Sequence, residues 1–172
     1  MPAYLITGTP GAGKSSIIEE LKRRGYAAFS ADEDLNITAH FDIATGEKLA
    51  KAPPAPIDHS KYAWNWDIPL IQKLIAENDI MFLAGTSHNM WQNLGLFDKI
   101  FVPHPSADKL KRRLLSRTNN DYGKHPDELA EIMRDHETDE DFWGSKGSVI
   151  INGDQPIKKI VDTILEYVPG AH

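Results

Sequence analysis

Short apolar runs alternate with amphipathic stretches along most of the chain. The runs are of strand length and lie at 3–7, 26–30, 80–84, 100–102 and 149–151. Between them, apolar residues recur at helical spacing after Lys14, Asp67, Ser106, Pro126 and Pro156. Buried strands alternating with helices predict an α/β fold with a mostly parallel sheet of about five strands. Ligands of such sheets bind where the strands end.

Two segments do not fit this alternation. The segment 36–61 contains Gly46, Pro53, Pro54 and Pro56. It predicts mainly loop, with one short helix near 35–41. The polar segment 118–125 predicts a mobile loop before a helix that begins at Pro126 and runs to about Asp139.

Composition narrows the class of protein. The chain has 172 residues, of which 41% are hydrophobic and 26% charged, and this predicts a single globular domain over 1–172. The net charge of −6 disfavours general binding of nucleic acid or of anionic membranes. The absence of cysteine excludes disulfides, thiolate metal sites and cysteine nucleophiles, and it fits a cytoplasmic protein. No apolar run is long enough to span a membrane, and no signal peptide is recognisable.

The strongest chemical signal is the loop 8–15, GTPGAGKS, which fits G-x-x-x-x-G-K-[ST] between a strand and a helix. Its backbone amides and the following helix N-terminus can bind phosphate. Lys14 can reach the β- and γ-phosphates, and Ser15 can hold Mg²⁺. The predicted nucleotide-binding residues here are Gly8, Gly11, Ala12, Gly13, Lys14, Ser15 and Ser16.

Two pairs of charged residues are candidates to act together with this loop. Asp32 and Asp34 follow the second strand, and on an extended segment both would face the strand ends, whereas Glu33 would point away. One could bind Mg²⁺ and the other accept a proton. Arg113 and Arg117 lie four apart on a predicted helix, so they would share a face and could stabilise a transferring phosphoryl group.

In these features the chain resembles the P-loop kinases of the nucleotide kinase and shikimate kinase type. The matching segments are 8–15, Asp32-Glu33-Asp34, Gly85, 113–117 and 152–156. The resemblance implies a three-layer P-loop NTPase fold with strand order 2-3-1-4-5, an acceptor-binding insert at about 35–66 and a lid at about 117–126. It also implies ATP and Mg²⁺, with adenine near Gln155 and Pro156. No carboxylate ends the third strand, so the roles of metal ligand and base fall on Asp32 or Asp34.

The sequence also suggests where an acceptor would bind. The predicted acceptor residues are Trp64, Trp66, Gly85 and Asn89. No arginine occurs between Arg24 and Arg112, and the insert offers only Lys48, Lys51 and Lys61. This predicts a largely uncharged small-molecule hydroxyl acceptor, such as a nucleoside, polyol or sugar. A nucleoside monophosphate kinase is the alternative, with these lysines or Arg134 binding the phosphate. A nucleotide hydrolase and a non-catalytic nucleotide-binding module are further alternatives.

Overall fold

A computed structural model describes residues 1–118 and 120–171. Within these residues the central sheet has five parallel strands in the order β2-β5-β1-β6-β7. The strands are β1 (Ala3–Ile6), β2 (Ala27–Ser30), β5 (Met81–Ala84), β6 (Lys99–His104) and β7 (Val149–Asn152). Counted along the parallel strands alone, this is the order 2-3-1-4-5, so the predicted fold class is confirmed.

Alternating side chains of the strands fill two cores. Tyr4 and Ile6 point to one face, which is covered by α1 (Lys14–Arg23) and α5 (Ile157–Glu166). Leu5 points to the opposite face, where α2 (Ile68–Glu77), the 3₁₀ helix η1 (Trp91–Leu96) and the end of α4 (Pro126–Ser145) pack. All three strand residues are at most 2% exposed, as expected for a sheet that is covered on both faces.

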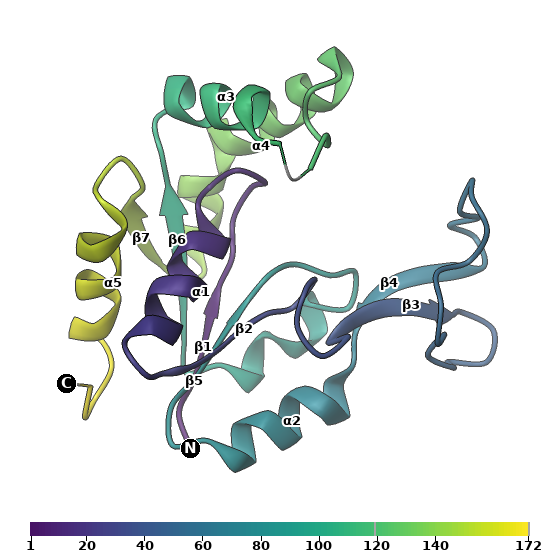
Figure 1. Ribbon diagram of the computed structural model, residues 1–172, viewed down its shortest axis with the longest axis horizontal. Coiled ribbons are helices and arrows are strands. Elements are labelled where there is room, and N and C mark those ends of the chain that lie inside the picture. Colours follow the sequence, from purple (N-terminus) through teal and green to yellow (C-terminus); the bar gives the residue numbers. More distant parts are fainter. Residues whose placement is uncertain (119, 172) are drawn as a thin grey trace.

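Two helices form a separate upper lobe. The helix α3 (Ala107–Ser116) packs its Leu110 and Leu114 against Ile132 of α4. In Figure 1 α3 and the first turns of α4 lie above the end of the sheet to which β6 points, and the last turns of α4 descend onto the sheet. The loop 8–13 also lies at that end, because it connects β1 to the start of α1. The upper lobe therefore covers the carboxyl-terminal edge of the sheet, where ligands bind in parallel α/β folds.

The predicted helix starts are largely confirmed by caps. The side chain of Asp67 accepts a hydrogen bond from Leu70 N (3.1 Å), and that of Ser106 accepts one from Lys109 N (3.4 Å). The helix that begins at Pro126 runs to Ser145, beyond the predicted end near Asp139. Its last turns continue because Trp143 is buried in the second core, which is a tertiary contact.

The prediction of a short helix near residues 35–41 is wrong. This segment leads into β3 (Thr38–Asp42), which pairs in antiparallel register with β4 (Tyr62–Trp66). The connecting segment 43–61 carries the prolines, and the hairpin projects from the body (Figure 1). A helix fails here because Ile37 and Trp66 anchor the two strands in the second core.

Two further predictions from the sequence concern the lid segment and membrane-spanning stretches. The lid segment expected at 117–126 includes Asn119, which lies outside the described residues. Among the residues described, no helix is both long and apolar enough to cross a membrane.

Candidate functional site

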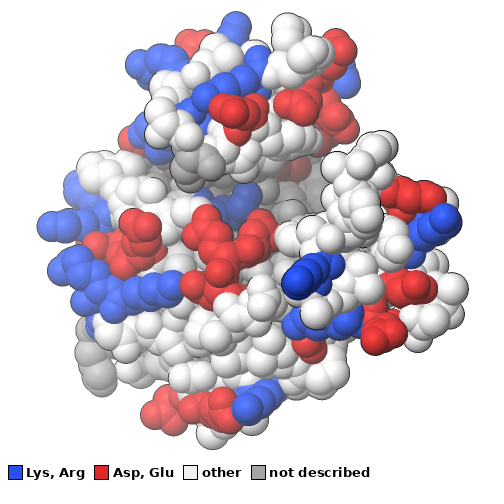
Figure 2. All heavy atoms as spheres, turned by 45° about the vertical axis from the view of Figure 1, so that its right-hand side comes forward, with Lys and Arg blue, Asp and Glu red and all other residues white. Residues whose placement is uncertain are grey.

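A cleft of about 760 Å³ opens where the loop 8–15 meets the upper lobe; we call it the P-loop cleft. Figure 2 shows the hollow between the upper lobe and the body, with acidic side chains gathered on its lower rim. Most of the predicted site residues line this cleft: Gly8, Gly11, Gly13, Lys14, Ser15, Ser16, Asp32, Trp64, Gly85, Arg113 and Arg117. Ala12 is instead buried beneath the loop. The structure therefore brings the phosphate loop, one acidic residue and both arginines together.

The Lys14 side chain folds back over the loop. Its Nζ donates hydrogen bonds to Gly8 O (2.7 Å) and Thr9 O (2.9 Å). Burial lowers the pKa of Lys14 to about 8, although the nearby carboxylates of Asp32 and Asp139 act in the opposite direction. The ammonium group is thus held at the place where the loop would bind phosphate, with carboxylates as its nearby counter-charges.

This pKa predicts a pH dependence. Lys14 carries its charge below about pH 8 and loses it above. If kcat/KM for ATP requires that charge, it should fall as the pH rises through about 8, by up to tenfold per pH unit. Bound phosphates stabilise the ammonium form, so kcat should decline only at higher pH. Initial rates between about pH 6.5 and 10 test this, and a flat kcat/KM over that range would contradict it.

The arginine Arg113 bridges two loops. Its guanidinium lies 3.4 Å from Gly11 O and 3.5 Å from Gly153 O, between the phosphate loop and the turn after β7. Burial lowers the pKa of Arg113, and Asp154 partly offsets this. A Cβ at Gly11, where φ is +80°, would lie 3.0 Å from Leu114 Cδ2, so α3 rests directly on the loop. The base of the upper lobe is therefore fixed to the phosphate loop.

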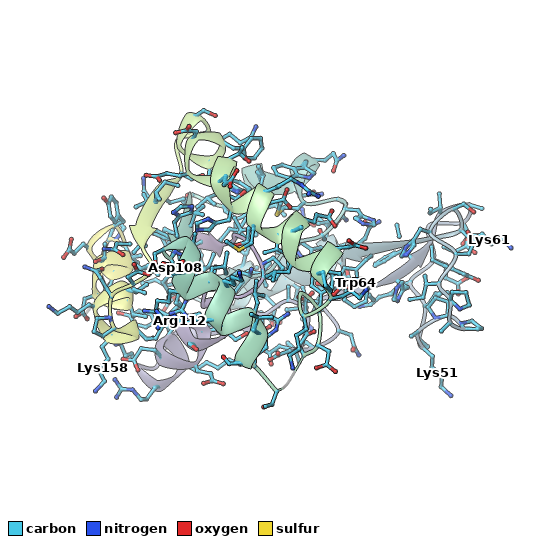
Figure 3. The ribbon with its side chains drawn as sticks, turned by 90° about the horizontal axis from the view of Figure 1, so that it is seen from above. Lys51, Lys61, Trp64, Asp108, Arg112 and Lys158 are labelled. Carbon is cyan, nitrogen blue, oxygen red and sulfur yellow. The ribbon has the colours of Figure 1, made fainter. Side chains whose placement is uncertain are left out.

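Arg113 and Arg117 line the same cleft, but Arg117 is the C-terminal cap of α3, which ends at Ser116, and not part of the helix. Its backbone N–H donates to Arg113 O (3.1 Å), and the chain leaves the helical path after it. Arg117 reaches the cleft from the loop, where its Nε donates to Asn120 O (3.1 Å) and its Nη2 to Tyr122 O. In this position it organises the segment that faces Lys14. Arg112, in contrast, is exposed on α3 and lies outside the cleft (Figure 3).

The expected arrangement of the acidic residues is also corrected. Residues 31–36 form turns and not an extended segment, so their spacing does not place alternate side chains together. Asp32 and Glu33 both line the cleft, and Asp32 lies close enough to Lys14 to raise the pKa of Lys14. Asp34 is engaged elsewhere, because it pairs with Lys22 Nζ (2.8 Å) and accepts from Ser30 N (2.8 Å). Burial raises the pKa of Asp34, but the contacts with Lys22 and Ser30 together lower it below its usual value.

The cleft residues fit a magnesium ion that is bound together with nucleotide. Mg²⁺ usually takes one or two protein ligands, keeps several waters and binds the substrate phosphates. The Ser15 hydroxyl and the Asp32 carboxylate both face the cleft and match that pattern. Within the described part of the chain, no cluster of three or more His, Cys, Asp or Glu side chains is suited to hold a metal by itself.

A second cavity of about 480 Å³ adjoins the cleft; we call it the aromatic cavity. The two share Gly8, Pro10, Trp64 and Thr86. Its walls carry Trp64, Trp91, Phe142 and Trp143, and its other lining residues include Thr86, Ser87, His88, Asp135 and Asp139. The rings of Trp91 and Trp143 stack with centroids 5.4 Å apart.

Most residues of this cavity were not predicted from the sequence. Asp135, Asp139, Phe142 and Trp143 lie on one face of α4 at helical spacing, a pattern that becomes visible once the helix is extended to Ser145. Trp91 comes from η1, which was not predicted.

Two predicted acceptor residues have structural roles. Trp66 is 1% exposed and packs in the second core against Phe97. Asn89 accepts from Trp66 N (2.9 Å) and donates to Trp66 O (3.0 Å), so it fixes the loop after β5 to the hairpin. Gly85 lines the cleft, but a Cβ there would lie 2.9 Å from that of Ala31, so close packing also requires this glycine.

The remaining predicted groups lie outside both cavities. Gln155 and Pro156 precede α5, and only the neighbouring Ile157 lines the cleft. Lys48 pairs with Asp67 (2.8 Å). Lys51 and Lys61 lie at the far end of the hairpin (Figure 3). Arg134 is exposed on α4 and lines neither cavity.

Solved structures of other proteins have a fold similar to that of this chain. No family model matches the chain, and no curated protein matches it. Three similar solved structures are all kinases. A shikimate kinase from Acinetobacter baumannii in complex with shikimate is 14% identical with a TM-score of 0.63, over 98% of this chain and 93% of that one. A gluconokinase from Sinorhizobium meliloti 1021 is 19% identical with a TM-score of 0.58, over 96% and 90%.

The third is a deoxyadenosine kinase from M. mycoides with bound dATP, which is 13% identical with a TM-score of 0.54, over 95% of this chain and 97% of that one. The chain therefore has the α/β fold of the P-loop kinases, as its motifs predict.

Proposed function

We propose that this protein is an ATP-dependent kinase that transfers the γ-phosphoryl group of ATP to a hydroxyl group of a small molecule. The observation that carries the proposal is the continuity of the two cavities. The P-loop cleft holds Lys14 and Ser15, and it opens past Gly8 and Trp64 into the aromatic cavity. A nucleotide and an acceptor could therefore meet at the phosphate loop.

Each lining group has a role in this reaction. The loop amides, the N-terminus of α1 and Lys14 bind the phosphates. Ser15 and Asp32 would hold Mg²⁺, which neutralises charge on the phosphates. Arg113 and Arg117 approach from the upper lobe and stabilise charge that develops on the transferring group. Catalysis of this type depends mainly on positioning and electrostatics.

The transfer balances without a further reactant. The acceptor oxygen forms a bond to the γ-phosphorus, and the bond from that phosphorus to the bridging oxygen of ADP breaks. The hydroxyl proton passes to the carboxylate of Asp32, which releases it to water. The products are ADP, a phosphate monoester and a proton.

The lining of the aromatic cavity supports an acceptor without a phosphate or carboxylate. Among its described lining residues there is no lysine or arginine. An anionic acceptor would normally be bound by such groups, most often by a bidentate arginine. This favours a hydroxyl acceptor over a nucleoside monophosphate.

A coupled ADP-release screen tests the proposal. Nucleosides, sugars, polyols and the common nucleoside monophosphates are each added with ATP and Mg²⁺. We expect stimulation by members of the first three groups. Efficient phosphorylation of AMP, CMP, UMP, GMP or dTMP, with the others inert, would identify a nucleoside monophosphate kinase. ADP release that no acceptor stimulates would identify a hydrolase, and nucleotide binding without turnover a binding module.

The role of Arg117 gives a separate prediction. Replacing Arg117 with alanine should lower kcat more than it raises the KM for ATP, because its charge acts mainly on the transferring group. Steady-state kinetics with a saturating acceptor measure both constants. Arg112→Ala is the control and should have nearly unchanged kinetics, since that side chain is exposed outside the cleft. A larger effect of Arg112→Ala would contradict this assignment.

A further inference from the structure

We propose that the acceptor carries a protonated amine as well as its hydroxyl group, and that the amine binds in the aromatic cavity between the α4 carboxylates and the aromatic walls. This inference rests on the proposed function, because it names the chemical class of the acceptor. The compounds meant are hydroxylated amines, such as amino sugars or aryl-substituted amino alcohols.

The aromatic cavity is acidic. Asp135 and Asp139 lie one turn apart on α4, and both line the cavity. Among the described residues, neither carboxylate has an ion-pair partner within 4.0 Å. The only other titratable side chain of the described lining is His88. The described lining of the cavity thus carries two carboxylates and no lysine or arginine, although Lys14 in the adjoining P-loop cleft acts on Asp139.

The electrostatics of Asp139 agree with this. Burial and the neighbouring Asp135 raise its pKa, and the charges of His104, His136 and Lys14 oppose the shift. Asp139 is half-buried and is repelled by Asp135, which is exposed. A cation bound beside them would relieve that repulsion.

Independently of this charge, the cavity exposes large aromatic side chains. Trp91 is 47% exposed and Phe142 is 42% exposed, although both are large and apolar. Their rings contact each other edge to face at 5.6 Å, next to the stack of Trp91 on Trp143. Aromatic faces bind ammonium groups by cation–π attraction, as Phe142 does with Lys146 Nζ at 5.0 Å from its centroid, and they also pack against sugar or aryl rings. A bound molecule would cover this surface.

The position and size of the cavity also suit such a ligand. Gly8 and Pro10 form its border with the P-loop cleft, whereas Asp135 and Asp139 come from the upper lobe. A ligand spanning the cavity could therefore direct a hydroxyl toward the phosphate loop and an amine toward α4. A volume of about 480 Å³ lies within the range of small-molecule sites and suits one or two rings.

An uncharged polyol is the competing ligand, because carboxylates also accept hydrogen bonds from hydroxyl groups. Comparing each amine with matched uncharged compounds distinguishes a site for an amine from a site for a polyol. Each amine, for example glucosamine, is compared with its N-acetyl derivative and with the parent alcohol, here glucose. These members keep the reacting hydroxyls and differ in charge.

Two measurements are made on each pair with the full-length protein. Coupled ADP release gives kcat/KM, and tryptophan fluorescence with ADP and Mg²⁺ present gives the Kd, because three tryptophans line the cavity. We expect amines of the right shape to be favoured by about tenfold in both, because cation–π attraction and the half-buried carboxylate of Asp139 act together on the ammonium group. Asp139→Asn and Asp135→Asn should each reduce this preference. Glu137→Gln, an exposed change on α4 outside the cavity, should not.

The outcomes separate this inference from the proposed function. Phosphorylation of neutral or anionic acceptors with no preference for amines would overturn the inference and leave the kinase assignment intact. An amine preference unchanged in Asp139→Asn and Asp135→Asn would also overturn it. Amine binding that depends on these carboxylates, with no phosphoryl transfer to any acceptor, would support the cation site and refute the kinase. The absence of binding by every amine would overturn the inference.

Discussion

Replacing Lys14 with alanine is expected to lower kcat/KM for phosphoryl transfer by about 10²-fold or more while the fold is retained. The ammonium group lies over the phosphate loop, within hydrogen-bonding distance of Gly8 O and Thr9 O. Its aliphatic stem fills no part of either hydrophobic core. The variant therefore loses a preorganised positive charge and little packing. Coupled ADP release with the best acceptor measures the loss, and circular dichroism and the Tm report on the fold.

Lys111→Ala is the matched control for this variant. Lys111 is exposed on α3 and lines neither cavity, so its removal changes the net charge equally without touching the site. Near wild-type turnover by a folded Lys14→Ala protein would refute the assignment of the phosphate loop. A loss of the same size in Lys111→Ala would point to a general charge effect.

The second large effect is expected at Asp32. Asp32→Asn should reduce kcat by about 10²-fold or more, because it removes the carboxylate proposed to accept the hydroxyl proton and to hold Mg²⁺. The change nearly preserves size. Since Asp32 acts on the charge of Lys14, the same variant should also lower the pKa seen in the pH profile of kcat/KM.

Glu33→Gln is the stringent comparison, because Glu33 lines the same cleft on the same turn. We expect a clearly smaller effect there, and an unchanged pH profile. Asp34→Asn tests a different property: it breaks the pair with Lys22 and should lower the Tm more than the activity. Equal activities of Asp32→Asn and Glu33→Gln would show that the turn is merely solvated, and the base would then have to be another residue.

The parallel layers and the phosphate loop could be predicted from the sequence. Buried strands such as Ala3–Ile6 and amphipathic helices such as Ile157–Glu166 depend on local periodicity, which neighbouring residues encode. The loop 8–15 likewise depends on residues that are adjacent in the chain, because the backbone conformation itself binds phosphate. Its position at the carboxyl end of the sheet then follows from the fold class.

Pairing of distant segments could not be predicted in this way. The strand Thr38–Asp42 exists because Tyr62–Trp66 pairs with it, across a segment whose prolines indicate only loop. That hairpin buries Trp66 and leaves Trp64 on the cavities, although the two residues look alike in the sequence. Both side chains lie on the same side of β4, because they are two residues apart, so their exposure depends on position along the strand: Trp66 stands at the end of β4 that enters the second core.

The aromatic cavity was decided by tertiary structure alone. Its walls come from β4, the segment before η1, η1 itself and the last turns of α4, which are far apart in the chain. Asp139 reads in the sequence as one more acid in a solvated run, and only packing of α4 over the sheet turns it toward Lys14 and the cavity. Local sequence thus determined where phosphate binds, because backbone geometry is local. The shape and charge of the second cavity required the fold, because they arise from side chains that only long-range packing brings together.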